Sequence, residues 1–89
     1  MTVYWVNYDL NKTGQKYQEL IAYLKSHDDW AKPLESSMFV KTGLTSAALR
    51  DGAKKFLDSN DSILVMEVSG TDWAVLSDPE IIEWMHRNL

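Results

Sequence analysis

Apolar and polar residues follow one another along the chain in patterns that predict its secondary structure. Residues 2–8 are rich in β-branched and aromatic side chains, which favours a strand, and turn-forming residues at 9–14 end it. An apolar stripe with helical spacing then predicts a helix over 15–26. An irregular edge strand containing a proline is expected at 30–34, and a regular strand at 35–41.

The second half of the chain continues with a helix and a strand and then adds a short extension. Thr45 is placed to cap the helix, and Gly52 inside that helix predicts close packing against the sheet. The apolar run at 62–68 predicts a buried strand. A fifth short strand is expected at 73–76, and Ser77 has a glutamate three residues later, which is the capping-box pattern of a last helix.

This order of elements is typical of an α+β domain with the ferredoxin-like β-α-β-β-α-β sheet, in which the helices cover one face. No linker or repeat divides the chain, so we expect a single domain over 1–89, with a core at about 2–68 and a C-terminal short strand and helix at about 72–89. Four apolar residues are expected on the uncovered sheet face, namely Val6, Tyr8, Leu64 and Met66. An exposed apolar face of that size usually meets a partner, which predicts a homodimer through the sheet face unless the appended elements cover it.

Composition narrows the classes of function. There are no cysteines, which excludes disulfides, thiolate catalysis and cysteine-bound zinc. No basic region precedes an apolar stretch at the N-terminus, and no segment approaches the roughly 18 apolar residues of a membrane span, so we expect a cytoplasmic protein without a membrane partner. Neither a glycine-rich phosphate loop nor a hydrolase nucleophile motif occurs. His27, beside two aspartates at a helix end, is expected to be a charged surface group.

The net charge of −4 argues against a general polyanion binder, so any contact with nucleic acid is expected to be local. Two groups of cations are candidates for phosphate contacts: Arg50, Lys54 and Lys55 in the second helix, and Lys12 with Lys16 before and in the first helix. A solvated helix face is the alternative interpretation of the first group, because these cations pair naturally with Asp51 at helical spacing.

Asp9 is the residue best placed for chemistry. It directly follows a buried strand, at the sheet edge where ligand sites of α/β folds often gather. Its carboxylate is suited to a hard cation such as Mg²⁺, which binds one or two carboxylates and keeps several waters. The alternative is a loop cap that accepts backbone N–H bonds. A single carboxylate is a weak metal-binding site, and a two-fold dimer would supply a second carboxylate.

Four short segments between Val3 and Val68 resemble the family of the smaller universal CRISPR adaptation protein: Tyr8-Asp9-Leu10, Glu35 to Val40, Gly43-Leu44-Thr45 and Asp58 to Val65. They look still closer to its relatives sometimes labelled SinR-family proteins, with the VapD-type ribonucleases more distant. The resemblance implies a ferredoxin-like homodimer, with metal-dependent cleavage of phosphodiester bonds in some members and a structural role in others. It implies Asp9 as catalytic residue and metal ligand, and Ser37 matches the family's serine. After Asp9, where the family often has acidic and arginine residues, the chain departs from the pattern.

The sequence is therefore compatible with three functions. The first is a Mg²⁺-dependent endonuclease acting on RNA or DNA, in which Asp9 holds the cation. The second is a non-catalytic dimer that binds nucleic acid or another protein. The third is an acidic inhibitor that mimics nucleic acid and blocks a basic partner.

Overall fold

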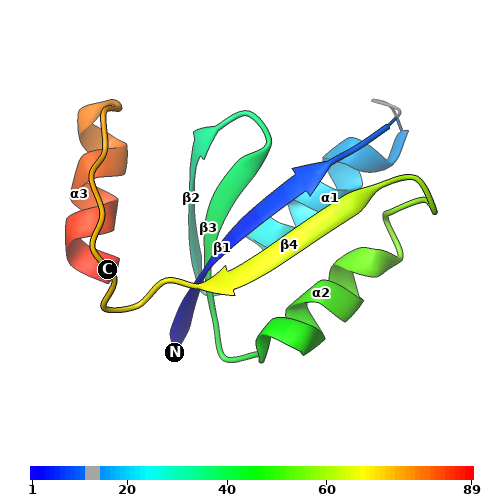
Figure 1. The fold of residues 1–89 in the computed structure, drawn as a ribbon, viewed down its shortest axis with the longest axis horizontal. Helices are drawn as coiled ribbons and strands as arrows, with labels where there is room; N and C mark the ends of the chain where they lie inside the picture. The colour runs from blue at the N-terminus through cyan, green and yellow to red at the C-terminus, as the bar shows by residue number, and fades with distance from the viewer. Residues whose placement is uncertain (12–14) are drawn as a thin grey trace.

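The computed structural model describes residues 1–11 and 15–89. Its helices and strands follow one another as β1 (Thr2–Asp9), α1 (Gln15–Lys25), β2 (Asp29–Leu34), β3 (Ser37–Thr42), α2 (Ser46–Lys54), β4 (Ser62–Glu67) and α3 (Pro79–Asn88) (Figure 1). No helix of this described part is long and apolar enough to cross a membrane.

The strands form one sheet in the order β2-β3-β1-β4, and every neighbouring pair is antiparallel. β1 is central, so that Trp5 lies opposite Phe39 of β3 on one side and Met66 of β4 on the other. The prediction of a small α+β domain is confirmed: a four-stranded antiparallel sheet carries three helices in the described residues. β2 contains Pro33 and a register irregularity, as expected of an edge strand.

α1 and α2 cover one face of the sheet. Val6 and Tyr8 of β1 are buried there against apolar side chains of both helices, among them Leu20 and Leu49. The expectation that Val6 and Tyr8 lie on the uncovered face is therefore wrong. Because side chains alternate along a strand, it is the odd-numbered residues of β1 that face the other way.

The opposite face of the sheet is partly covered by the C-terminal residues of the same chain. Trp84 of α3 stacks on Phe39 with ring centroids 5.5 Å apart, and Val3 of β1 belongs to the same buried cluster. In Figure 1, α3 stands beside β2, away from β4. Leu64 and Met66 of β4 stay 55% and 49% exposed, so the strip of this face along β4 is uncovered.

The predicted fifth strand does not form. Residues 71–76 have no regular secondary structure, although Trp73 and Val75 alternate with exposed neighbours as in a strand. These two side chains pack on the cluster beneath α3. The segment is held by side-chain contacts with the sheet face, and therefore it joins no backbone ladder at a sheet edge.

Of the two helix N-caps predicted from the sequence, one is present in the structure and the other is not. Thr45 caps α2 as predicted, since its hydroxyl accepts a hydrogen bond from the Ala48 amide at 3.1 Å. At α3 the cap is Asp78, which accepts from the Ile81 amide at 3.1 Å, and the prediction of Ser77 is wrong. Pro79 explains the shift, because proline favours the first helical position and an extended residue before it.

Candidate functional site

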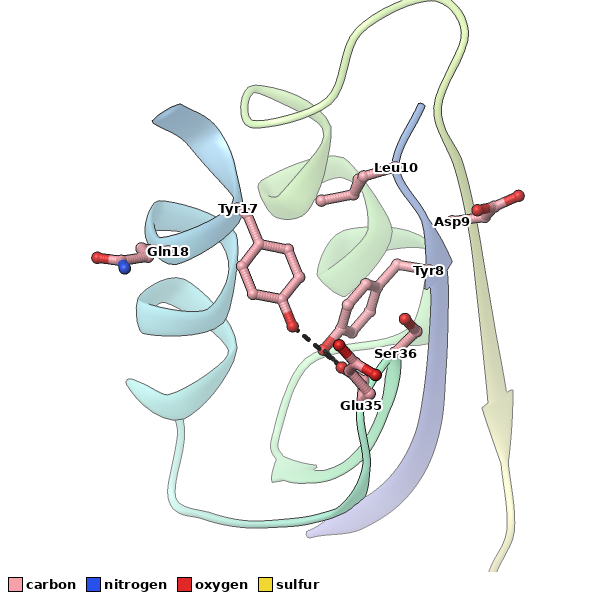
Figure 2. A pocket seen from close by; sticks show the side chains of 7 residues that line it. All are labelled: Tyr8, Asp9, Leu10, Tyr17, Gln18, Glu35 and Ser36. Carbon is pink, nitrogen blue, oxygen red and sulfur yellow. Dashed lines mark hydrogen bonds between the residues drawn. The ribbon is translucent and has the colours of Figure 1, made fainter. Parts of the chain in front are cut away.

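Asp9 ends β1 opposite Ser62 of β4, and its side chain is exposed. Figure 2 shows its carboxylate on the opposite side of β1 from the rings of Tyr8 and Tyr17, which places it on the face not covered by α1 and α2. Within residues 1–11 and 15–89, no group donates a hydrogen bond to this carboxylate and no cation pairs with it. In the described part of the chain, Asp9 is thus an exposed anion at the end of the open sheet face.

Asp61 is a loop cap that accepts backbone N–H bonds, which is the structural role that the sequence leaves as the alternative for Asp9. Its two carboxylate oxygens accept hydrogen bonds from the amides of Asn11, at 2.8 Å, and Asp58, at 2.7 Å. These two bonds, that from Asp58 first, lower the pKa of Asp61 below the ordinary aspartate value. Asp61 joins the segment after β1 to the loop before β4 and so fixes the end of β1 that carries Asp9.

Small polar residues surround Asp9 on the open face. Asn7 and Asp9 are two apart in β1 and point the same way, and Asn7 pairs across the sheet with Ser37 of β3. The Ser37 hydroxyl donates to the Asn7 Oδ1 oxygen at 2.6 Å. Together with Ser62 these side chains line a shallow hollow of about 440 Å³. Asp9 and Asn7 therefore share one depression on this face, whose lining also includes the apolar Leu64.

A second hollow, of about 470 Å³, borders Asp9 on the helix-covered side of the sheet (Figure 2). The Tyr17 and Tyr8 hydroxyls both donate to the Glu35 carbonyl oxygen, at 3.0 and 3.3 Å, and the Tyr8 amide donates to the Ser36 carbonyl oxygen at 3.1 Å. Burial first, and then the neighbouring Tyr17 hydroxyl, raise the pKa of Tyr8, so it stays protonated. The two tyrosines fix the turn between β2 and β3, and with it the start of β3 at Ser37.

The side chains around Asp9 offer little for a metal beyond one carboxylate. Within residues 1–11 and 15–89, no three histidine, aspartate or glutamate side chains gather as a potential metal site. Mg²⁺ fits a single carboxylate because it keeps most of its waters, and the amide and hydroxyl groups of Asn7, Ser37 and Ser62 are groups to which such waters hydrogen-bond. The donor set fits a weakly held, hydrated Mg²⁺ and no tightly coordinated metal.

The predicted cationic residues lie apart from Asp9. Arg50, Lys54 and Lys55 belong to α2 and its C-cap, which pack on the helix-covered face, whereas Asp9 points from the other face. Arg50 lies 3.0 Å from the Asp51 carboxylate, and Lys16 lies 3.6 Å from that of Asp58.

A hollow of about 610 Å³ beside α2 mixes cations with carboxylates, as it is lined by Arg50 and Lys54 and by Asp58 and Asp61. The part of the chain that the structure describes thus forms no purely basic patch around these residues. Lys12 lies outside the described residues.

Sequence reasoning overlooked Asn7, Ser62 and Asp61 as members of this region. Asn7 can be detected in the sequence, because asparagine is depleted in strands whereas the residues around it in β1 favour strand formation. Asp61 cannot be detected in this way, since its role depends on two loops that meet only in the folded chain.

Comparison with known proteins adds evidence about the fold alone. No family model matches the chain, and no curated protein does. Among solved structures, the chain is similar to the hypothetical protein TT1823 from Thermus thermophilus, with a TM-score of 0.65 and 22% sequence identity over 86% of this chain and 94% of that one. At that identity the match supports the arrangement of the elements and carries no information on activity.

Proposed function

We propose that this chain is a ferredoxin-like protein that dimerises through the uncovered strip of its sheet face and cleaves phosphodiester bonds in nucleic acid with Mg²⁺ held at Asp9. The observation that carries the proposal is the exposed Asp9 carboxylate, which accepts no hydrogen bond within residues 1–11 and 15–89 while Asp61 secures the adjoining loops. The order of elements and the antiparallel strand order β2-β3-β1-β4 support the ferredoxin-like assignment.

The dimer is needed because one carboxylate per chain holds Mg²⁺ weakly. Leu64 and Met66 are exposed apolar side chains on the same sheet face as Asp9, so a second copy packed there would bury them. The proposed two-fold axis passes at the Asp9 end of this strip, so that the two Asp9 side chains face each other across it. Bound Mg²⁺ supplies charge neutralisation at the phosphate and an activated water. The residues of the chain supply the carboxylates and the polar surface on which the phosphodiester lies.

The direct test compares cleavage of single-stranded RNA and DNA by the wild type and by Asp9→Asn, with Mg²⁺ or with EDTA. The wild type is expected to cleave only with Mg²⁺, and Asp9→Asn to lose cleavage while keeping its thermal stability. Asp72→Asn, which removes another exposed carboxylate on the segment before α3, is the matched control and is expected to cleave normally. Equal cleavage by the wild type and Asp9→Asn would refute the catalytic proposal.

A non-catalytic binding dimer is the second candidate. It is favoured by the scarcity of metal ligands, since the described residues bring no three acidic or histidine side chains together. In that case Asp9→Asn binds nucleic acid or its protein partner as the wild type does, and Mg²⁺ produces no cleavage in either. Binding to nucleic acid would weaken steeply with salt, whereas binding to a protein through Leu64 and Met66 would not.

A further inference from the structure

Asn7 is the one residue of β1 between Val3 and Tyr8 that does not suit a central strand. Its five companions in that stretch are β-branched or aromatic, whereas asparagine is depleted in strands. Its neighbours across the sheet are Ser37 and Leu64, so its side chain lies between one polar and one apolar partner. A residue that breaks a local rule in an otherwise consistent strand indicates a role other than folding.

The side chain of Asn7 is held in one orientation. Its Oδ1 oxygen accepts the hydrogen bond of the Ser37 hydroxyl at 2.6 Å, which leaves the amide NH₂ group as its unused donor. Among the described residues no group accepts a hydrogen bond from this NH₂ group, and Asn7 is half-buried and lines the hollow on the open face, so the N–H donor faces that hollow.

The donor lies beside the acidic group of the candidate site. Asn7 and Asp9 are two residues apart on the same face of β1, a spacing of about 7 Å along a strand. Both line the hollow of about 440 Å³. A ligand in this hollow meets a hydrogen-bond donor at one end and an anion that attracts a cation at the other.

We infer that the Asn7 amide, oriented by Ser37, binds a phosphate oxygen of the nucleic acid whose phosphodiester lies next to Asp9. The inference rests on the proposed function for the identity of the ligand. Amide side chains are regular donors to phosphate oxygens, and such a donor offsets the repulsion between the phosphate and a nearby carboxylate. Asn7 is then a binding residue, and Ser37 is a positioning residue that acts through it.

The test measures RNA affinity by fluorescence anisotropy with a short fluorescein-labelled single-stranded RNA, in Ca²⁺ to replace Mg²⁺. Asn7→Ala is expected to weaken binding about tenfold, the value of one hydrogen bond to a charged group. Asn7→Asp keeps the acceptor for Ser37 but replaces the donor by a second anion, so it is expected to weaken binding further. Ser37→Ala is expected to weaken binding less, and to add nothing in the Asn7→Ala background.

Three further measurements separate this role from a structural one and from the catalytic proposal. Thermal unfolding and molar mass in solution are expected to stay as in the wild type for Asn7→Ala. Mn²⁺ binding, followed by electron paramagnetic resonance, is expected to persist in Asn7→Ala and to be lost in Asp9→Asn. Ser69→Ala, in an exposed turn beyond β4, is the control for RNA binding.

The outcomes are distinguishable. Unchanged RNA affinity in Asn7→Ala overturns the inference even if Asp9 binds Mn²⁺. A change of molar mass in Asn7→Ala also overturns it, by assigning Asn7 to the dimer interface. Weaker RNA binding in Asn7→Ala, together with no Mn²⁺ binding and no cleavage by the wild type, refutes the catalytic proposal while it supports Asn7 as a nucleic-acid-binding residue.

Discussion

The Tyr23 side chain of α1 occupies the place where a side chain at position 52 of α2 would begin. A Cβ atom on Gly52 would clash with the Tyr23 hydroxyl oxygen and lie 2.5 Å from its Cζ carbon. The close packing predicted for this glycine exists, but its neighbour is the adjacent helix and not the sheet. Tyr23 itself is flanked by Phe56 and His27, with ring centroids 5.8 and 5.1 Å away.

Gly52→Ala is therefore expected to destabilise the protein, although alanine is the better helix former. Relief of the clash requires the Tyr23 ring to shift against its aromatic neighbours, an overpacking cost of about 1–3 kcal/mol. That cost outweighs a gain in helix propensity of about 1 kcal/mol. The free energy of unfolding from urea denaturation measures the difference.

The sign of the effect should reverse when the Tyr23 ring is absent. In a Tyr23→Ala background, Gly52→Ala is expected to stabilise the protein by about 1 kcal/mol, because only the propensity remains. Ala47→Gly, at an exposed position of α2, calibrates that propensity in the same helix. Destabilisation by Gly52→Ala in both backgrounds would show that Tyr23 is not the cause.

Asp61→Asn is expected to lower the thermal stability at neutral pH, since a carboxylate accepts the amides of Asn11 and Asp58 more strongly than a side-chain amide does. The pKa of Asp61 is lower in the folded protein than in the unfolded chain. Its contribution is therefore complete above the unfolded value of about 3.9 and is lost as the pH falls through the folded value.

Thermal unfolding of the wild type and Asp61→Asn across this acidic range provides the measurement. The difference between the two melting temperatures is expected to be constant at neutral pH and to shrink once the pH is below about 4. Asp72→Asn, which removes another exposed carboxylate, is the matched control. A difference that stays the same down to the most acidic pH would contradict the assignment.

The elements that sequence predicts well are those whose pattern is local. The apolar stripe of α1 and the Thr45 cap depend on residues within one or two turns of helix, and both are present. The segment 73–76 has strand-like residues, yet a strand also needs a free edge to pair with, and that depends on where the chain runs. The sequence also predicts the wrong sheet face for Val6 and Tyr8, because both faces of β1 are largely apolar.

The residues of the candidate site also differ in whether local sequence alone identifies them. Asp9 was identified from its position after a strand, which is a local property. Asn7 and Ser37 are 30 residues apart in sequence, and only the pairing of β1 with β3 brings them into contact. The loop-bracing role of Asp61 depends on Asn11, which is 50 residues away. The sequence alone therefore identifies Asp9, whereas the roles of Asn7, Ser37 and Asp61 depend on strand register and on loop contacts in the folded chain.

His27 was expected to be a charged surface group, and the structure contradicts this. The ring is half-buried, with Nδ1 3.1 Å from the Thr42 Oγ1 oxygen and a buried Nε2 atom that has no hydrogen-bond partner among the described residues. Burial lowers its pKa, against the smaller opposing effect of Asp28. As the pH falls below about 6.5, the unfolded chain takes up a proton before the folded protein does, so stability is expected to decrease.

The measurement is the melting temperature between neutral pH and about pH 5, in the range where histidine titrates. His27→Gln is expected to flatten the decrease, because the titrating group is gone. Asp28→Asn removes the charge that favours protonated His27, so it is expected to extend the decrease to lower pH. If His27→Gln shows the same slope as the wild type, another group is responsible.

The dimer proposal predicts that charges on the uncovered strip produce a monomer. Leu64→Lys with Met66→Lys places two cations where a second copy would bury apolar side chains, and burying unpaired charges is strongly unfavourable. Both residues are about half exposed, so the isolated chain is expected to remain folded. Molar mass from light scattering after size exclusion measures the change, with Leu34→Lys, 58% exposed on β2, as control.

The same variant tests whether metal binding and cleavage depend on the dimer. If the paired Asp9 side chains hold Mg²⁺, a folded monomer is expected to lose Mn²⁺ affinity and cleavage together, even though Asp9 is intact. If the monomer retains both, each chain carries a complete site and the two-fold pairing of Asp9 is refuted. A wild type that is already monomeric at the concentrations where it cleaves RNA would refute it as well. The oligomeric state therefore decides whether the single carboxylate of this fold is sufficient.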